Sequence, residues 1–502
     1  MTDQREAIRS NAKYLRQVRP IDPEEISSYV EGEPHPAVVA QILREEALDL
    51  GLVEREDGTF APVSDEPVPP RSAATSDPVH RLPERYVTRL EEDLVDRYGV
   101  DWHEGPSGSL LRSTIRRMKS QYLERRSVSY DEDVAAGYAI YHLPAYYAAI
   151  QYALDDLAER GLLERRLRVL DVGAGVGGPA LGLFEFLPDD SLVDYHAVEP
   201  GEGADVLEAL LEETGQNVHA TIHRTTVEAF DPGSLDDSRD SDADDADDAD
   251  PAFDLVLACN VLSELEDPEA VLRRTLEWLA PDGSLVAMAP ADKNASIELR
   301  ELERTLEADG VTVYGPTVRL WGGESPTDRG WSFDVHPDLE VPSFQRKLDQ
   351  AGKGADPGEF VNVDVQFSYS ILRRDGTRRI AIGLEGSGRA KMAEMERHVT
   401  NRIDLTAAKL SHSLSEARGG DGGGRGRDAD GRKPNPIFKI SDGSEAVDHY
   451  AVVTNETALN RPLLEAEYGD VLAFENVLVL WNDDEGAYNL VVDEETIVDR
   501  IG

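Results

Sequence analysis

Cysteine is almost absent from this sequence of 502 residues. The single cysteine, Cys259, excludes an internal disulfide, a four-cysteine zinc site and a cysteine-ligated iron–sulfur cluster. The first ten residues, MTDQREAIRS, are polar, which argues against a secretory signal. The most apolar stretch carries His142, Pro144 and Gln151, so a membrane span is not expected. We therefore expect a cytoplasmic protein.

Basic residues, and lysine above all, are also scarce. Asp and Glu number 99 against 51 Lys and Arg, which gives a net charge of −48, and only nine of the basic residues are lysines. This composition is typical of halophilic proteins, which use net charge for solubility, and it indicates a haloarchaeon. An acidic mesophilic protein is the alternative. The charge does not exclude RNA, because the Debye length in molar salt is about 3 Å and local arginine clusters then dominate.

The length predicts two to four domains, of which residues 1–70 form the first. Helical segments come first, followed by two short strands around the hairpin turn Asp57-Gly58. Helices followed by a small β wing are typical of a winged helix, a module that docks on nucleic acid or protein. An ordinary helical cap on the next domain is the alternative. The helix expected to enter a nucleic-acid groove begins at Ala37. It carries one arginine and three acidic residues, so it is poorly suited to bind there.

Residues 71–133 join a proline-rich linker to a strongly basic helical segment. A local excess of positive charge in so acidic a chain predicts contact with phosphate groups, and a merely solvated helix is the alternative. The basic residues are Arg112, Arg116, Arg117, Lys119, Arg125 and Arg126, against the single acid Glu124.

Residues 134–385 alternate predicted strands and helices, which predicts an α/β fold with a mainly parallel, seven-stranded, Rossmann-like sheet. Within them, residues 231–250 hold ten aspartates and one large apolar residue, Leu235, so we expect an acidic disordered insertion. Residues 386–433 are predicted to form a helix and a Gly/Arg/Asp linker. The strand-rich residues 434–502 predict a small β-rich domain, with an OB-like barrel as one option.

The segment LDVGAGVGG follows the first predicted strand of the α/β region. Gly173, Gly175 and Gly178 satisfy G-x-G-x-x-G, the dinucleotide-binding pattern. The same segment satisfies D-x-G-x-G-x-G, the pattern of S-adenosylmethionine (SAM)-dependent methyltransferases, through Asp171, Gly173, Gly175 and Gly177. In both cases glycine lets the backbone approach a ligand where a side chain would clash. A tight strand-to-helix corner without a ligand is the third interpretation.

Three features of the surrounding sequence favour SAM over NAD. Asp171 lies two residues before the first glycine, where a carboxylate can reach the methionine ammonium directly or through water, and NAD has no such cation. Glu199, 24 residues after Gly175, ends an apolar strand and can accept from both ribose hydroxyls, although this would also suit NAD. The third feature is the order of FDLVLACNVLSEL, a helix and LAPDGSLVAM, which resembles the methyltransferase stretch around the fourth and fifth strands.

Other residues near this loop are less informative. Asn260 ends the fourth strand, the usual place of a residue that faces the methyl group, and a buried polar group satisfied by the backbone is the alternative. Cys259 is expected to be a small core residue, because the context of a nucleophilic cysteine is missing. No catalytic residue and no metal ligand can be assigned. The predicted cofactor-binding residues are Asp171, Gly173, Ala174, Gly175, Gly177, Glu199 and Asn260.

Residues 136–374 resemble the ribosomal small-subunit methyltransferase-like family of bacteria, archaea and mitochondria. The similar segments are, in order, GYAIYHLPAYYAAIQYAL, VLDVGAGVG, LACNVLSEL, LVAMAPADKNASIELRELERTL, RGWSFDVHP and FVNVDVQFSYSILRR. The resemblance covers about half of the chain. It implies a class I methyltransferase fold, SAM at positions matching Asp171, Gly173, Gly175 and Glu199, and a role in small-subunit assembly or translation.

The sequence departs from this family at the Trp331-Ser332-Phe333 element. Many members carry cysteines there that can hold an iron–sulfur cluster, whereas this chain has none, so a metal cluster is not expected. The resemblance therefore predicts a SAM-dependent enzyme that methylates RNA of the small ribosomal subunit, its suspected partner. A ribosome assembly factor that binds SAM without turnover is the alternative, and a protein acceptor stays open.

Overall fold

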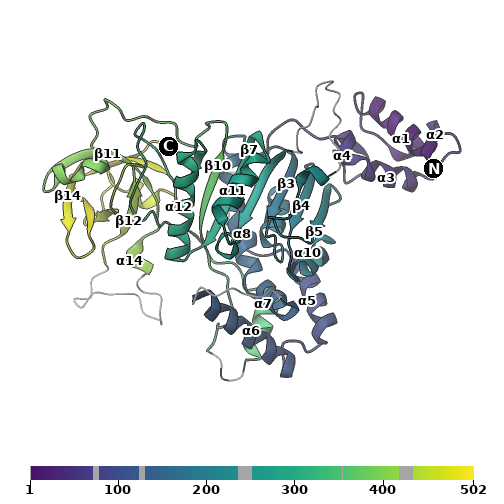
Figure 1. Ribbon diagram of the computed structural model, residues 1–502, viewed down its shortest axis with the longest axis horizontal. Coiled ribbons are helices and arrows are strands. Elements are labelled where there is room, and N and C mark those ends of the chain that lie inside the picture. Colours follow the sequence, from purple (N-terminus) through teal and green to yellow (C-terminus); the bar gives the residue numbers. More distant parts are fainter. Residues whose placement is uncertain are drawn as a thin grey trace. The chain divides into compact units, whose positions relative to one another are not determined.

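The computed structural model describes residues 2–71, 78–123, 131–235, 252–352, 354, 356–417 and 434–502. Two compact units make up the chain (Figure 1). Unit 1 consists of Met1–Glu266, Ala270–Leu285 and Pro337–Val365, and unit 2 of Asp267–Glu269, Val286–His336 and Gln366–Gly502. Among the described residues no helix is long and apolar enough to cross a bilayer.

The secondary structure consists of α-helices, β-strands and three short 3-10 helices (Figure 1). The α-helices are α1 (Thr2–Leu15), α2 (Pro23–Tyr29), α3 (Pro36–Glu45), α4 (Ala47–Leu50), α5 (Glu84–Tyr98), α6 (Gly105–Leu123), α7 (Glu132–Tyr141), α8 (Leu143–Ala158), α9 (Gly178–Phe186), α10 (Gly203–Leu211), α11 (Pro268–Glu277), α12 (Lys293–Ala308), α13 (Ser343–Gln350), α14 (Leu414–Ala417) and α15 (Pro462–Glu465). The strands are β1 (Leu52–Glu54), β2 (Phe60–Pro62), β3 (Arg166–Val172), β4 (Leu192–Val198), β5 (Val218–His223), β6 (Phe253–Cys259), β7 (Leu279–Pro290), β8 (Thr312–Gly315), β9 (Asp334–His336), β10 (Val365–Arg373), β11 (Arg402–Lys409), β12 (Ile437–Ser441), β13 (His449–Val453), β14 (Val471–Asn482), β15 (Ala487–Val492) and β16 (Ile497–Arg500).

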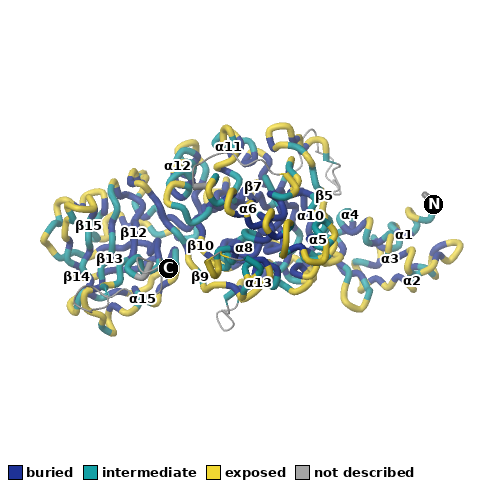
Figure 2. Tube along the Cα trace, turned by 90° about the horizontal axis from the view of Figure 1, so that it is seen from below, coloured by how far each residue is buried: buried dark blue, intermediate teal, exposed yellow. Residues whose placement is uncertain are grey.

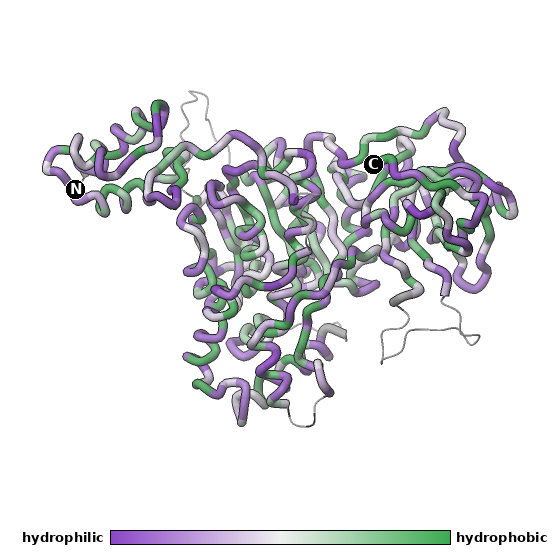
Figure 3. Tube along the Cα trace, turned by 180° about the vertical axis from the view of Figure 1, so that it is seen from behind, coloured by the Kyte–Doolittle hydropathy of each residue, from purple (hydrophilic) through white to green (hydrophobic). Residues whose placement is uncertain are grey.

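Unit 1 begins with the helices α1 to α4 and the antiparallel hairpin β1–β2. The alternation of polar and apolar residues along these helices is visible in Figure 3, and their apolar faces enclose a small core that includes Ile8, Leu43 and Phe60. The hairpin predicted around Asp57-Gly58 is confirmed, with Gly58 at φ +77° in the turn. A winged-helix identity stays a prediction.

The helical segment before the glycine loop is interrupted at one point. The residues AAGYAIYHLPAYYAAIQYAL form α7 and α8, with a break at His142. Pro144 lies in the first turn of α8. Backbone N–H groups in a first turn have no acceptor within the helix, so the missing N–H of proline costs no hydrogen bond there. The break therefore starts a new helix at a position that the apolar pattern alone does not mark.

The strands of unit 1 follow the order β5-β4-β3-β6-β7. The pairs β3–β4, β3–β6 and β4–β5 are parallel. Most residues of β3, β4 and β6 are buried, whereas those of the edge strand β5, labelled in Figure 2, are half-buried or exposed. In chain order these are the third, second, first, fourth and fifth strands of the sheet, which is the doubly wound arrangement. The predicted α/β class is thereby confirmed, and the order reverses beside β3.

Strand β7 is divided between the units, and in unit 2 the sheet continues as β7-β10-β8, with β9 paired to β10. The pair β10–β8 is antiparallel. The sheet has eight strands, so the prediction of seven was wrong. The extra strand, β9, has three residues, which is too short for a recognisable alternation of polar and apolar residues. The segment LAPDGSLVAM lies entirely within β7.

The rest of unit 2 contains a closed β-barrel. The order of pairing is β11, β12, β13, β15 and β14, and β14 pairs with β11 to close the barrel. Strand β16 also pairs with β14, along residues 472–475. The β13–β15 pair is parallel and the others are antiparallel. The small β-rich domain predicted for residues 434–502 is thus confirmed as a barrel, but its first strand precedes that boundary.

The helix predicted within residues 386–433 is wrong for most of its length. Residues Met392–His398 form a 3-10 helix, and Arg402–Lys409 form β11. The sequence RIDLTAAK suits a helix locally, yet Leu405, Ala407 and Ala408 are buried because β11 pairs with both β12 and β14. Tertiary pairing therefore overrides the local helix propensity. The predicted linker falls mainly on residues 418–433, which lie outside the described residues.

The acidic insertion predicted at residues 231–250 is described only at its start. Pro232–Ser234 form a 3-10 turn, in which Asp231 accepts a hydrogen bond from the Gly233 N–H at 3.1 Å. Residues 236–251 lie outside the described residues, so the prediction of disorder stays untested.

Candidate functional site

The candidate site lies at the carboxyl end of β3, beside the point where the strand order of unit 1 reverses. In doubly wound sheets, ligands bind in the crevice at this edge, because the loops that follow neighbouring strands leave it open. The glycine loop, defined as residues 173–177, connects β3 to α9 here. The sequence therefore places its most informative motif at the position that the topology favours.

The glycines of the loop are required for two different reasons. Gly173, Gly175 and Gly177 have φ values of +66°, +55° and +87°, in the left-handed region that favours glycine. A Cβ on Gly173 would lie 2.4 Å from Val261 Cγ2, and one on Gly177 would lie 2.5 Å from Leu207 Cδ1. At Gly175 the nearest such atom is the Gly173 carbonyl oxygen at 3.9 Å. The loop is thus closely packed at both ends, and at Gly175 it leaves room for a ligand.

Glu199 follows β4 directly and connects two loops through its carboxylate. Oε2 accepts a hydrogen bond from the Gly175 N–H at 2.8 Å, and Oε1 accepts one from the Gly201 N–H at 2.7 Å. Only 9% of the residue is exposed. Each carboxylate oxygen can accept a second hydrogen bond, so Glu199 retains acceptor sites for hydroxyl groups of a ligand. The contact between Glu199 and Gly175 joins two residues that the sequence predicted independently.

Asp171 lies in β3 beneath the loop and is 1% exposed. Its Oδ2 accepts a hydrogen bond from the Tyr195 hydroxyl at 2.7 Å. Burial raises the pKa of Asp171 to about 7, the hydrogen bond from Tyr195 opposes the rise, and the charge of Glu199 adds to it. No basic side chain forms an ion pair with Asp171 in the described part of the chain. A cation bound at the loop would therefore favour the ionised form of this carboxyl group.

The two remaining residues of the predicted site are Ala174, within the loop, and Asn260, beside it. Ala174 is buried, and its carbonyl oxygen accepts from the Gly177 N–H at 3.0 Å, which closes the turn. Asn260 is partly exposed and has φ +61°, next to Val261, which abuts Gly173. Asn260 therefore lies beside the loop in a conformation that is uncommon for a residue other than glycine.

Cys259 is a core residue, as predicted. It is buried at the end of β6, and burial together with the charge of Asp171 raises the pKa of its thiol well above the ordinary value. A thiol in this state is a poor nucleophile, because the thiolate is the reactive form.

An aromatic group at the α7–α8 junction was missed by the sequence interpretation. It consists of Tyr138, Tyr141, His142 and Tyr146, all partly exposed. A Cβ on Gly178, at the start of α9, would lie 3.1 Å from both Tyr146 Cβ and the Leu143 carbonyl oxygen, so the group lies next to the end of the glycine loop. The motif YHLPAYYAA contains three of these residues, but only the helix break at His142 shows that they gather.

The basic segment before the α/β fold is partly structural. Arg112 is buried and donates to the carbonyl oxygens of His103 and Leu348 at 2.9 and 3.2 Å, so its prediction as a phosphate contact is wrong. The guanidinium of Arg116 pairs with both carboxylate oxygens of Glu359 at 2.6 and 2.8 Å.

Two of the remaining basic residues are available at the surface. Arg117 is exposed, and Lys119 is partly exposed with its ammonium 4.3 Å from the centre of the Tyr141 ring. Arg125 and Arg126 lie outside the described residues. The positive charge available to a phosphate is thus smaller than the sequence suggested.

The Trp331-Ser332-Phe333 element belongs to a buried polar network in unit 2. Ser332 Oγ contacts the Tyr468 hydroxyl at 2.7 Å and accepts from Arg300 at 3.2 Å. Trp331 is 8% exposed, and the ammonium groups of Lys293 and Lys439 lie 5.2 and 5.1 Å from its ring centre. Across the described residues, no group of three His, Cys, Asp or Glu side chains could hold a metal ion.

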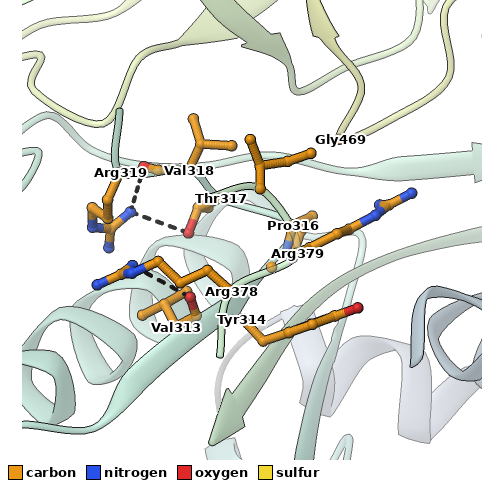
Figure 4. A pocket seen from close by; sticks show the side chains of 11 residues that line it. Val313, Tyr314, Pro316, Thr317, Val318, Arg319, Arg378, Arg379 and Gly469 are labelled. Atoms are coloured by element: carbon orange, nitrogen blue, oxygen red, sulfur yellow. Dashed lines mark hydrogen bonds between the residues drawn. The ribbon is translucent and has the colours of Figure 1, made fainter. Parts of the chain in front are cut away.

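Two hollows in the molecule lie away from the glycine loop. The cavity in unit 2 shown in Figure 4 has a volume of about 10 Å³, enough for one water molecule at most. Arg319 and Arg378 line it and donate to Thr317 Oγ1 and the Val313 carbonyl oxygen at 3.3 and 3.4 Å.

The other hollow is a groove of about 1020 Å³ in unit 1. It runs between the β1–β2 turn and the starts of β4 and β5, where Ser191, Val193 and Val218 line it. The starts of parallel strands form the edge opposite the glycine loop, so this groove does not belong to the candidate site.

Residues 170–285 match the family described as a methyltransferase domain, which covers the glycine loop, Glu199 and β6. The chain therefore contains a methyltransferase domain. Residues 5–56 and 393–501 match the N-terminal and C-terminal domains of a family described as a domain of unknown function, DUF8157. No curated protein matches the chain.

Three solved structures with similar folds share little sequence with this chain. An S-adenosylmethionine-dependent methyltransferase from Clostridium acetobutylicum is 13% identical over 29% of this chain, which spans half of that protein, with a TM-score of 0.21. The plantazolicin methyltransferase BpumL in complex with SAH is 13% identical over 57% of this chain and 99% of that protein, with a TM-score of 0.28. A putative RNA methyltransferase from Pyrococcus horikoshii is 13% identical over 52% and 98%, with a TM-score of 0.28. Scores this low do not distinguish one substrate from another.

Proposed function

We propose that this protein binds SAM at the glycine loop and methylates RNA of the small ribosomal subunit in the cytoplasm of a haloarchaeon. The observation that carries the SAM assignment is the contact between Glu199 and Gly175, because it sets acceptor oxygens beside the one glycine of the loop that has open space. A ribose placed there would donate its two hydroxyls to Glu199. The methyl group that SAM supplies would then face the carboxyl end of β6, where Asn260 lies.

Asp171 supports SAM over a dinucleotide. The methionine moiety of SAM carries an ammonium group, and Asp171 is a buried carboxyl group without a cationic partner in the described residues. Because a nearby cation stabilises the charged carboxylate, the ligand would supply the charge that the chain does not. NAD has no cation in the corresponding position.

The RNA and ribosomal part of the proposal rests on the resemblance of residues 136–374 and on the flanking modules. We interpret the N-terminal helices and hairpin as a winged helix, and the closed five-stranded barrel as OB-like, a class of barrel that binds oligonucleotides. Both modules would direct the methyltransferase domain to a nucleic acid. Arg117 and Lys119 provide two cations for phosphate groups on α6.

A ribosome assembly factor that binds SAM without turnover is the second candidate. It is favoured by the state of Cys259, whose buried thiol has a raised pKa and is therefore a poor nucleophile. Asn260, the neighbouring polar residue, has no titratable group that could serve as a general base.

Methylation of small subunits isolated from a strain without this gene tests the proposal. With labelled SAM in molar KCl, we expect the purified protein to label the small-subunit rRNA, and Glu199→Gln to lower SAM affinity about five- to a hundredfold, since a charged hydrogen-bonding partner is lost. Glu212→Gln, at an exposed carboxylate directly after α10, is the matched control and should bind SAM normally. Binding without labelling would favour the assembly factor, and absence of SAM binding in calorimetry would contradict both.

A further inference from the structure

The aromatic group at the α7–α8 junction consists of rings that contact one another and belong to partly exposed residues. His142 and Tyr146 stack at 5.5 Å between ring centres with 11° between their planes. Tyr138 lies 4.7 Å from His142, and Tyr141 meets His142 edge-on at 4.9 Å. All four are partly exposed, whereas Tyr147, on the next position of α8, is buried in the core. These four residues therefore do not belong to the fully buried core.

The neighbouring helix fixes the place of this group relative to the glycine loop. A Cβ on Gly178 would touch Leu143 and Tyr146, and one on Gly182 would lie 2.3 Å from the Tyr147 carbonyl oxygen. Helices α8 and α9 thus run side by side in the same direction, with their first turns level. Because α9 begins where the glycine loop ends, the aromatic group lies at the carboxyl edge of the sheet, beside the site proposed for SAM.

The charge beside the group, a single ammonium, favours an anionic ligand. The Lys119 ammonium lies over the Tyr141 ring at 4.3 Å and donates to the Glu359 carbonyl oxygen at 3.0 Å. The carboxylate of Glu359 is neutralised by Arg116. Burial and the charge of Lys119 lower the pKa of His142 to about 4, so its imidazole is neutral at pH 7 and adds no repulsive or attractive charge to the stack.

We infer that the aromatic group is a stacking surface for a base of single-stranded RNA, held next to the methyl donor; this rests on the proposed function. Aromatic rings beside a cation are the usual means of binding single strands, because every base has a π-face and every phosphate a charge. The acceptor would then be approached through an unstacked base.

Binding of two decamers with the same phosphates tests the inference. One is a decamer of uridine, and the other has the same backbone without bases; fluorescence anisotropy is measured in molar KCl with saturating S-adenosylhomocysteine. We expect the full-length protein to bind the uridine decamer at least fivefold more tightly, as expected for one stacked base. Tyr146→Leu should bind both decamers equally, and Tyr146→Phe, which keeps the ring, should retain the preference. Tyr14→Leu, at a residue of α1 that is 72% exposed, is the control and should also retain it.

The outcomes separate this inference from the proposed function. Equal binding of both decamers by the unmodified protein would overturn the stacking surface. It would also be overturned if Tyr146→Phe and Tyr146→Leu lost the preference for the uridine decamer to the same extent, since the hydroxyl would then be the binding group. Tyr138→Leu and Tyr138→Phe provide a second pair if Tyr146→Leu does not fold. Calorimetry with SAM is run on every variant: normal SAM binding without base preference rejects only this inference, and base preference without SAM binding rejects only the proposed donor site.

Discussion

Asp171 in unit 1 and Glu303 in unit 2 are both carboxyl groups with at most 2% of the residue exposed, yet their pKa values move in opposite directions. Burial raises the pKa of Asp171 to about 7, although the Tyr195 hydroxyl donates a hydrogen bond to it. Burial acts to raise the pKa of Glu303 as well, but the charges of Arg300 and Arg319 outweigh it and lower that pKa to about 2. The difference lies in the partners, since removal from water penalises both charges.

The comparison distinguishes a binding site from a structural network. Glu303 accepts from Arg300 at 2.5 Å, from Thr317 at 2.7 Å and from Ser370 at 2.8 Å, so its acceptor sites are filled by the chain itself. Asp171 is buried beside a loop with open space at Gly175 and lacks a cation in the described residues. A buried acid that the fold leaves without a counter-charge is a candidate for a cationic ligand.

Replacing the two acids should change stability in opposite directions. Glu303→Ala leaves Arg300 and Arg319 buried without their common partner and should lower the free energy of unfolding by about 3–5 kcal/mol. Asp171→Asn, without SAM at pH 8, should raise it by about 1–4 kcal/mol, because the folded protein no longer has to hold an ionised carboxylate in an apolar place. Guanidinium unfolding of both variants measures the difference.

The pH dependence of the free energy of unfolding shows independently that Glu303 stabilises the fold and that ionised Asp171 destabilises it. The contribution of Glu303 is present above its unfolded pKa, near 4.5, and is lost as the pH falls towards 2. The penalty of Asp171 grows as the pH rises from about 4 to 7, because the unfolded chain ionises first. A stabilising effect of Asp171→Asn that is the same at pH 5 and pH 8 would contradict the raised pKa.

SAM affinity should depend on pH through Asp171 and not through Glu303. The ammonium of SAM favours the ionised carboxylate, so binding below pH 7 must displace a proton, and affinity should rise by up to about tenfold per pH unit and level off near pH 8. Asp171→Ala should weaken binding by about 1–3 kcal/mol and remove the pH dependence. Calorimetry from pH 5.5 to 8.5 measures both, and a flat profile for the unmodified protein would show that Asp171 does not sense the ligand.

The glycine loop allows a smaller, graded test of the same site. Gly173→Ala would bring its Cβ to 2.4 Å from Val261 and should lower both stability and SAM affinity by about 1–3 kcal/mol. Gly175→Ala meets no atom closer than 3.9 Å, so its stability should fall only by the backbone strain of about 1 kcal/mol, while a ligand in the open space would clash. Thermal unfolding with and without SAM separates the two effects. If Gly175→Ala binds SAM normally, the ligand does not occupy this space.

Much of the candidate site could be predicted from the sequence, because its parts are local. The alternation of strands and helices predicted the α/β class, and the spacing of Asp171, Gly173, Gly175 and Glu199 predicted a loop that the structure brings into one place. The left-handed φ values and the close approach of Val261 to Gly173 explain why glycine stands there. Such requirements act over a few residues, so they leave a readable pattern.

Only the tertiary structure shows the features that depend on contacts between residues distant in the sequence. Strand β11 is a strand because it pairs with β14, although residues 402 and 478 are separated by most of the barrel sequence. Arg112 has a structural role because it donates a hydrogen bond to the carbonyl oxygen of Leu348, which is distant in the sequence. The aromatic group forms because the chain breaks at His142 and α8 packs along α9. The sequence alone thus determined the fold class and the loop, through local sterics and hydrogen bonding, whereas long-range packing decided which strands close the barrel and which side chains surround the loop.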